Sequence, residues 1–556
     1  MDKNKKNSTG RNFVVQGSIL AVASILVRLI GVVYRVPMTN IIHDSGNGYY
    51  SNAYTIYSMM LLLSSYSLPL AVSKLVSVHS AIGKWKNVEK ILKSALIFSA
   101  ISGGIFSLLV GFGAEFFTAT FMKNELASIA LRFLAPTILI MGFLGTFRGF
   151  FQGLHTMIPT AFSQIIEQII NAIVSVGAAA LLFSYGSKVD ELKQTTEYKY
   201  AWGAAGGTIG TGVGALIALI FFLILFQAYH GVLKKKVKRD RTESTETCWT
   251  FFKIIVATAI PVILSTAVYN IIDLVDASLF SYYMQDTKQY NEIWGAYSAK
   301  YLLLIHVPVA FASAMASAAV PSISEAYARK DRKTIIVKTK TTLQVVLYIA
   351  IPSMVGLMIL ADPVIHLLFR NDTSSAALYL MVGSVAVLFF SLATVTNGIL
   401  QGINKMTVPV KNAVIALGVH ILLFYLVTWK MNIGIYGVIV SYVGFGICMA
   451  TLNCFAITKY LGYQQNILKL YILPLLSAIV MGIFCFFTYN SLAKLLGGTE
   501  RFISLFICVM ASILVSVVVY FICTVLFRSV NEAELRTLPM GHKLVVIAKK
   551  LRLLPK

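Results

Sequence analysis

The stretch RLIGVVYRVPMTNIIHDSGNGYYSNAYTIYSMMLLLSSYSLPLAVSKLVSVH, residues 28–79, decides how this chain folds. It places Arg28 and Arg35 in one apolar run, follows them with a Gly/Asn/Ser turn, and continues into a second apolar run. On a helix, residues seven apart lie roughly 10 Å apart along the axis and about 20° apart around it, so the two arginines form one basic stripe. A cation inside an apolar span costs roughly 2.5 to 3.5 kcal/mol on insertion scales, which favours a hydrated cavity with a partner over lipid.

The rest of the chain extends this apolar pattern. It has 556 residues, of which 57% are apolar and 13% charged, and its mean hydropathy is +0.76. A soluble protein carries about twice that charged fraction. Apolar runs of about 20 residues predict an all-α polytopic membrane protein with fourteen transmembrane helices. The predicted spans are residues 14–34, 52–72, 92–113, 127–147, 160–183, 201–228, 254–282, 296–320, 342–361, 376–399, 411–429, 434–457, 470–489 and 503–527.

The net charge of +24 is distributed unevenly between the two sides of these spans. Most of the Lys and Arg residues fall in the N-terminus, in every second loop and in the C-terminus. By the positive-inside rule, both termini are therefore predicted to be cytoplasmic. No cytoplasmic loop is long enough to fold into a nucleic-acid-binding domain, so nucleic acid is not an expected partner.

An internal repeat organises the chain. The segment FQGLHTMIP at 151–159 recurs as LQGINKMTVP at 400–409, and the loop AIGKWKNVEKI after the second span matches YARKDRKTIIV after the eighth. Six spans per copy is an even number, so the copies are related by a pseudo-two-fold axis along the membrane normal, facing each other across a central cavity. The predicted parts are an N-terminal six-helix lobe 1–228, a basic cytoplasmic linker 229–253, a C-terminal six-helix lobe 254–458, helices 13 and 14 at 459–527, and a basic amphipathic cytoplasmic tail 528–556.

Glycines in the sixth span recur every four residues, at Gly206, Gly210 and Gly214. This spacing predicts close helix packing rather than a phosphate-binding loop, which needs a preceding strand and a soluble domain. No ATPase chemistry is encoded, so no cofactor is expected, and transport energy would come from Na⁺, H⁺ or the membrane potential. Neither the cysteines nor the histidines have the spacing of metal ligands, so no metal site is expected.

The opening stretch, together with RGFFQGLHTMIPTAFSQIIEQ at 148–168, IIDLVD in span 7 and VPSISEAYARKD at 320–331, resembles the stage V sporulation protein B group. That group comprises proposed lipid II flippases within the multidrug/oligosaccharidyl-lipid/polysaccharide (MOP) exporter superfamily. The resemblance implies a MATE-like fold in the bacterial plasma membrane and a polyprenyl-pyrophosphate-linked saccharide as substrate, carried by alternating access. Asn171 and Lys300 depart from the basic residues expected at or near these positions in relatives.

A carrier of this substrate needs cations for the pyrophosphate, and the candidates are Arg28, Arg35, Arg132 and Lys300. An alternative for Arg35 is a snorkelling position at the interface, and Arg132 or Lys300 could instead neutralise Glu167 or Asp273. The candidate ion-coupling acids are Glu167, Asp273 and Asp276. The two aspartates are three apart, so they share a helix face and could hold one proton or a sodium ion, or form static bridges with the cations.

Three functions compete at this point. The first is a flippase, expected to act as a monomer among membrane lipids and not as an enzyme. The second is a cation-coupled multidrug exporter, which would need an acidic or aromatic cavity. The third is a polyprenyl-dependent membrane glycosyltransferase, which would need a large loop with paired carboxylates or histidines; the loop from Tyr185 to Tyr200 lacks that spacing. The basic stripe favours the flippase.

Overall fold

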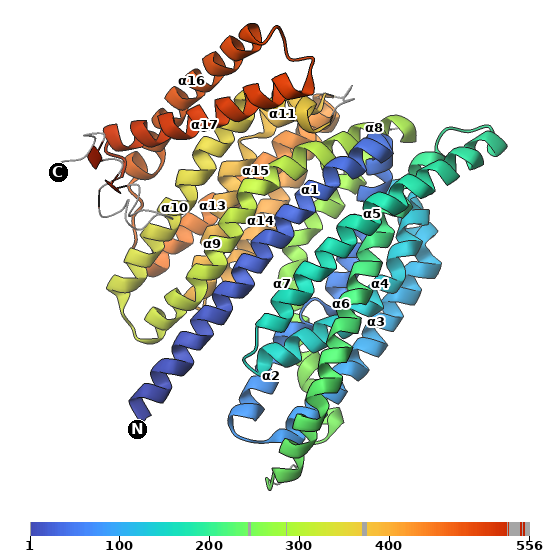
Figure 1. The fold of residues 1–556 in the computed structure, drawn as a ribbon, viewed down its shortest axis with the longest axis vertical. Coiled ribbons are helices and arrows are strands. Elements are labelled where there is room, and N and C mark those ends of the chain that lie inside the picture. The colour runs from blue at the N-terminus through green and yellow to red at the C-terminus, as the bar shows by residue number, and fades with distance from the viewer. Residues whose placement is uncertain are drawn as a thin grey trace. The chain divides into compact units, whose positions relative to one another are not determined.

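The computed structural model describes residues 2–242, 246–284, 286–369 and 375–530, together with 532, 545–546 and 549–550, and this part of the chain is helical without strands (Figure 1). The elements are α1 Asp2–Ser65, α2 Leu68–Ala81, α3 Trp85–Met122, α4 Ala127–Gly153, α5 Ile158–Lys193, α6 Tyr198–Arg239, α7 Cys248–Tyr283, α8 Thr287–Ala296, the π-helix η1 Tyr297–Leu302, α9 Leu303–Ala328, α10 Arg332–Ile359, α11 Ala361–Leu368, α12 Ala376–Gly383, α13 Ala386–Gly402, α14 Thr407–Phe424, η2 Tyr425–Lys430, α15 Ile435–Leu461, η3 Leu468–Ile472, α16 Leu473–Leu495 and α17 Phe502–Leu526.

Apolar helices dominate the described chain. Eleven of them are long and apolar enough to cross a membrane, or up to 12 if α12 and α13, bent by 53°, form one span. The predicted fourteen spans are compatible with this result. The predicted spans 14–34 and 52–72 lie on either side of a kink within α1, and α7 covers the predicted span 254–282.

The kink in α1 is a reversal of the chain. His43 has a φ of 57°, in the left-handed region, which interrupts the helix. The amide of Asn47 donates a hydrogen bond of 2.8 Å to the His43 carbonyl and so stabilises the turn. Met38 before the turn and Tyr50 after it both lie beside Gly207 of α6, which requires the two halves of α1 to run back along each other. The predicted reversal between the first two spans is confirmed, but the helix breaks at His43, and the Gly/Asn/Ser residues 45–48 are helical.

The helices pack into two compact units, Met1–Ala299 and Lys300–Lys556, here called unit 1 and unit 2. Within unit 1, α5 packs against α6, and α4 against α3 and α6. Within unit 2, α9 packs against α10 and α13, and α16 against α17. The predicted amphipathic tail 528–556 falls mostly outside the described residues.

Matching turns support the sequence repeat. In unit 1, His155 has a φ of 60° and its N–H donates to the Gln152 carbonyl at 2.9 Å. In unit 2, Asn404 has a φ of 59° and donates to the Gln401 carbonyl at 2.9 Å. The second pair of matched loops shares its geometry too, with positive φ at Gly83 and at Lys330.

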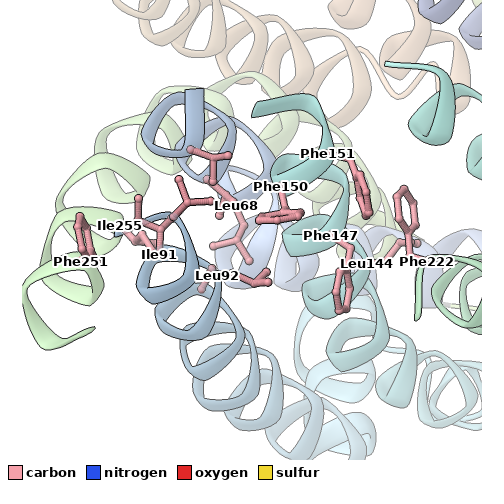
Figure 2. Packing of buried hydrophobic residues seen from close by; sticks show 14 of the residues in the cluster. Leu68, Ile91, Leu92, Leu144, Phe147, Phe150, Phe151, Phe222, Phe251 and Ile255 are labelled. Atoms are coloured by element: carbon pink, nitrogen blue, oxygen red, sulfur yellow. The ribbon is translucent and has the colours of Figure 1, made fainter. Parts of the chain in front are cut away.

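A buried core at one end of unit 1 joins five of its helices. Leu68 of α2, Ile91 of α3, Phe150 of α4, Phe222 of α6 and Phe251 of α7 belong to one cluster of apolar side chains (Figure 2). Each of these side chains is nearly inaccessible, so together they fix how α2, α3, α4, α6 and α7 pack.

Candidate functional site

The reversal at His43 surrounds Arg35 with tyrosines. Arg35 is half-buried on the first half of α1, next to Tyr34. The second half of α1 brings Tyr50 and Tyr54 to it, and Tyr34, Tyr50 and Tyr54 lie close enough to interact electrostatically with the guanidinium. The rings of Tyr50 and Tyr54 stack with centroids 5.7 Å apart. The result is a cation beside several phenol hydroxyls, a combination suited to an anionic, hydroxylated ligand.

Helix α5 forms the neighbouring wall of this cluster. The amide of Asn171 donates to the Tyr34 hydroxyl at 3.4 Å. Glycines of α6 allow α5 to approach closely, since a Cβ on Gly210 would lie 2.6 Å from the Asn171 carbonyl oxygen, and one on Gly214 would lie 2.5 Å from the Glu167 carbonyl oxygen. The predicted packing role of these glycines is confirmed. The close contact fixes where Glu167 and Asn171 lie along the axis of α6.

Glu167 pairs with Arg148, a residue that the sequence analysis did not select. The Arg148 guanidinium lies 2.6 Å from the Glu167 carboxylate, and the side chains are only 12% and 20% exposed. Arg148 also donates to Ser163 at 3.2 Å. Glu167 interacts electrostatically with Tyr54 and Tyr57, so this ion pair adjoins the tyrosine cluster around Arg35.

Arg148 was not among the predicted site residues because it lies one residue beyond the predicted span 127–147. The structure extends α4 to Gly153 and places Arg148 inside the helix. The signal that could have revealed it is the charge pattern within the quoted stretch 148–168, where one arginine and one glutamate occur in otherwise uncharged sequence. An apolar stretch with one charge of each sign favours their pairing, because each is costly to bury alone.

Two of the predicted cations lie at exposed positions. Arg28 is exposed on α1. Arg132 of α4 pairs with Glu115 of α3 at 3.2 Å, and their side chains are 52% and 65% exposed. The alternative in which Arg132 neutralises Glu167 is wrong in this structure, because Glu167 bonds to Arg148. The substrate contacts assigned to Arg28 and Arg132 stay predictions.

The remaining candidates are Asp273 and Asp276 in unit 1 and Lys300 in unit 2. In unit 1, Asp273 is exposed and Asp276 is buried, one helical turn apart on α7. In unit 2, Lys300 is buried in the π-helix η1, with its ammonium 5.7 Å from the centre of the Phe369 ring. The ion-coupling role of the aspartates and the substrate contact of Lys300 stay predictions.

The chain matches a family described as polysaccharide biosynthesis protein over residues 14–327, and a second family described as MatE over residues 261–426. The first match covers more than half of the 556 residues.

Relatives of known name align along most of the chain. Stage V sporulation protein B of Bacillus subtilis (strain 168) is 23% identical over 537 residues, covering 95% of this chain and 98% of the relative. Lipid II flippase MurJ of the same organism is 24% identical over 484 residues, covering 84% of this chain and 86% of the relative.

Solved structures share the fold. A lipid II flippase MurJ in an inward closed conformation has a TM-score of 0.62 at 17% identity, covering 91% of this chain and 98% of the other. An inward-facing multidrug resistance MATE family transporter of the MOP superfamily has a TM-score of 0.58 at 16% identity, covering 79% and 98%. The proteins named in these matches as flippases and transporters are not enzymes, in agreement with the prediction for this chain. The chain belongs to the polysaccharide biosynthesis protein family, as a multi-pass membrane transporter with the fold of the solved MurJ and MATE structures.

Proposed function

We propose that this protein is a flippase that moves a polyprenyl-pyrophosphate-linked saccharide across the bacterial plasma membrane by alternating access, with the peptidoglycan precursor lipid II as its cargo. The relative named lipid II flippase MurJ aligns over 84% of this chain and supports this substrate class. Both termini are proposed to be cytoplasmic because the basic residues collect in alternate loops. The protein is proposed to act as a monomer.

The cluster around Arg35 carries the proposal. A pyrophosphate is an anion whose oxygens suit the planar fork of arginine. Tyr34, Tyr50 and Tyr54 beside it offer hydroxyl groups and ring faces, which suit a saccharide next to the diphosphate. The polyprenyl chain needs no pocket in the protein if it remains in lipid. Arg28, which lies seven residues before Arg35 on the same face of α1, is proposed to guide the headgroup toward Arg35.

The energy source is proposed to be the membrane potential or an ion gradient. Asp273 and Asp276 are the candidate acids for a coupled Na⁺ or H⁺ on α7. Glu167 is the less favourable candidate in the conformation described, because its carboxylate is bonded to Arg148 at 2.6 Å. Applying a pH, Na⁺ or electrical gradient separately across liposomes distinguishes these sources.

The test is transport of lipid II between the leaflets of liposomes that contain the purified protein. The expected result is movement of chemically unchanged lipid II, with strong loss in Arg35→Ala and partial retention in Arg35→Lys. Wild-type rates in Arg35→Ala would overturn the proposed site. Movement of a cationic drug without movement of lipid II would instead establish a multidrug exporter, and a chemically altered lipid would establish a glycosyltransferase.

A further inference from the structure

A cavity lies in unit 1, at the end where the helices carry most of their lysines. Its volume is about 470 Å³. It opens between the ends of α2, α3 and α4 and the last turns of α6. The lining residues are Ser80, Ala81, Trp85, Phe151, Leu154, His155, Thr156, Pro159, Leu225, Tyr229 and Lys236.

The floor of this cavity is apolar. Phe151 belongs to the buried cluster of unit 1 (Figure 2), and Leu154, Leu225 and Tyr229 pack against that cluster. The same apolar surface that holds the helices together thus continues into an open recess. A hydrocarbon chain is the kind of group that such a recess can accept without leaving polar atoms unpaired.

The rim of the cavity is cationic. The ammonium of Lys236 lies 4.0 Å from the centre of the Trp85 ring and 5.9 Å from that of Tyr229. The ion pairs found among the described residues do not include Lys236, so the rings hold its charge without a carboxylate to neutralise it. His155 is exposed at the same rim. An anionic group can therefore approach Lys236 from the open side.

Hydrogen bonds between the basic linker and α3 hold the end of α6 beside the cavity. Asp240, just after α6, accepts a hydrogen bond of 2.9 Å from the backbone N–H of Lys86, in the first turn of α3. Glu246 accepts one of 2.9 Å from the Asn87 side chain. Because α3 engages Asp240 and Glu246 in this way, these two acids fix the end of α6 beside Trp85 while Lys236 remains at the rim.

The repeat provides an internal comparison. In the matched loops, Trp85 of unit 1 corresponds to Arg332 of unit 2, since each follows the positive-φ residue, Gly83 or Lys330, by two positions. Arg332 donates hydrogen bonds of 3.1 and 3.3 Å to the Leu461 carbonyl, so its side chain bonds to its own unit. Unit 1 thus has an aromatic ring beside a lysine that belongs to none of the described ion pairs, whereas the repeat places an arginine at the matching position of unit 2.

We propose that this cavity is a binding site for an anionic phospholipid of the cytoplasmic leaflet. The phosphate would lie on Lys236 and His155, and part of an acyl chain would occupy the recess over Phe151 and Leu225. By the positive-inside rule, this lysine-rich end lies at the level of the cytoplasmic headgroups, where basic residues attract anionic lipid. The site is separate from the cluster around Arg35 and does not depend on the identity of the transported lipid.

The test uses the full chain in lipid nanodiscs, with native mass spectrometry of bound lipid during titration with phosphatidylglycerol or phosphatidylcholine. Lys236→Gln is compared with Lys235→Gln, which makes the same charge change at an exposed position next to it. We expect the apparent Kd for phosphatidylglycerol to rise about fivefold in Lys236→Gln and less than about twofold in Lys235→Gln. Phosphatidylcholine should bind weakly to all three proteins, and millimolar inorganic phosphate should not displace the phosphatidylglycerol.

Leu225→Trp fills the recess and should abolish the tightest binding step while the melting temperature stays near that of the wild type. Equal effects of the two lysine substitutions would overturn the proposal, since binding would then reflect total charge alone. Displacement by inorganic phosphate would also overturn it, because a site for a free anion needs no acyl chain. If Leu225→Trp failed to fold, the comparison of the two lysine variants would still decide.

Discussion

Helix α4 carries two arginine–glutamate pairs that differ mainly in burial. Near its start, Arg132 lies 3.2 Å from Glu115, and the side chains are 52% and 65% exposed. Near its end, Arg148 lies 2.6 Å from Glu167, and the side chains are 12% and 20% exposed. The first pair is exposed, and exposed ion pairs typically contribute little to stability. The second pair is held by its surroundings, so loss of one partner leaves a buried charge.

The largest expected effect comes from breaking the buried pair. Arg148→Ala should lower the free energy of unfolding by about 3 kcal/mol, because Glu167 would keep a desolvated carboxylate without its cation. Unfolding in mixed detergent micelles measures this. Part of the loss should return in the double variant Arg148→Ala/Glu167→Ala, in which no unpaired charge remains.

Arg132→Ala is the matched control, on the same helix and with the same chemistry. Its effect on the free energy of unfolding should stay below about 1 kcal/mol. Similar losses in the two single variants would show that burial does not separate the two pairs.

The next effect concerns the two arginines of α1, which repeat the same contrast. Arg35 is half-buried among tyrosines, whereas Arg28 is exposed. Removing a charge-assisted hydrogen bond to a phosphate should lower lipid II transport about 10- to 100-fold in Arg35→Ala. The loss in Arg28→Ala should be smaller, because that side chain is the more exposed of the two. Initial flipping rates in liposomes measure both, and a larger loss in Arg28→Ala would move the binding site toward the exposed end of the stripe.

The sequence was sufficient to predict the helical fold, the family and the reversal within residues 28–79. These features depend on long apolar runs and local turn residues, which are visible in one dimension. The close packing of α5 on α6 was also predictable, because Gly210 and Gly214 share one helix face.

The pairing of the charges was not predictable from sequence. Arg148 and Glu167 lie on different helices, and their contact depends on how α4 and α5 are rotated about their axes. In a soluble helix, polar residues mark the outer face, but a membrane helix is apolar on every side, so its sequence does not show which face is buried. For the same reason, the exposed position of Arg132 could not be distinguished in advance from the more buried position of Arg35.

A smaller effect should follow from adding a methyl group where α6 contacts α5 at Glu167. A Cβ on Gly214 would lie 2.5 Å from the Glu167 carbonyl oxygen, whereas a Cβ on Gly231, also in α6, meets nothing within 4 Å. Gly214→Ala should lower the free energy of unfolding by about 1 to 2 kcal/mol through overpacking. Gly231→Ala should leave it unchanged or raise it by up to about 1 kcal/mol, because alanine favours the helix. Stabilisation by both substitutions would mean that α5 can move away, and with it Glu167.

The smallest effect concerns a carboxylate that is held by hydrogen bonds instead of an arginine. Donors from the Thr242 side chain and from the backbone N–H groups of Lys86 and Thr242 lower the pKa of Asp240 from 3.8 to about 2. Since the folded pKa is the lower one, these bonds stabilise the docked linker above about pH 4, and that stabilisation is lost as the pH falls toward 2. Hydrogen exchange should therefore show the first turn of α3 opening in Asp240→Ala at neutral pH.

Asp331→Ala is the control for this last comparison. Asp331 caps its own helix by accepting from the Thr334 N–H at 3.1 Å, whereas Asp240 caps α3 by accepting from the N–H of Lys86, 154 residues earlier in the chain. Loss of the local cap should speed exchange only at the start of α10, by an amount equivalent to about 1 kcal/mol. Loss of the long-range cap should speed exchange in both the linker and α3, because one carboxylate holds two segments together. Faster exchange confined to the linker would show that α3 does not depend on Asp240.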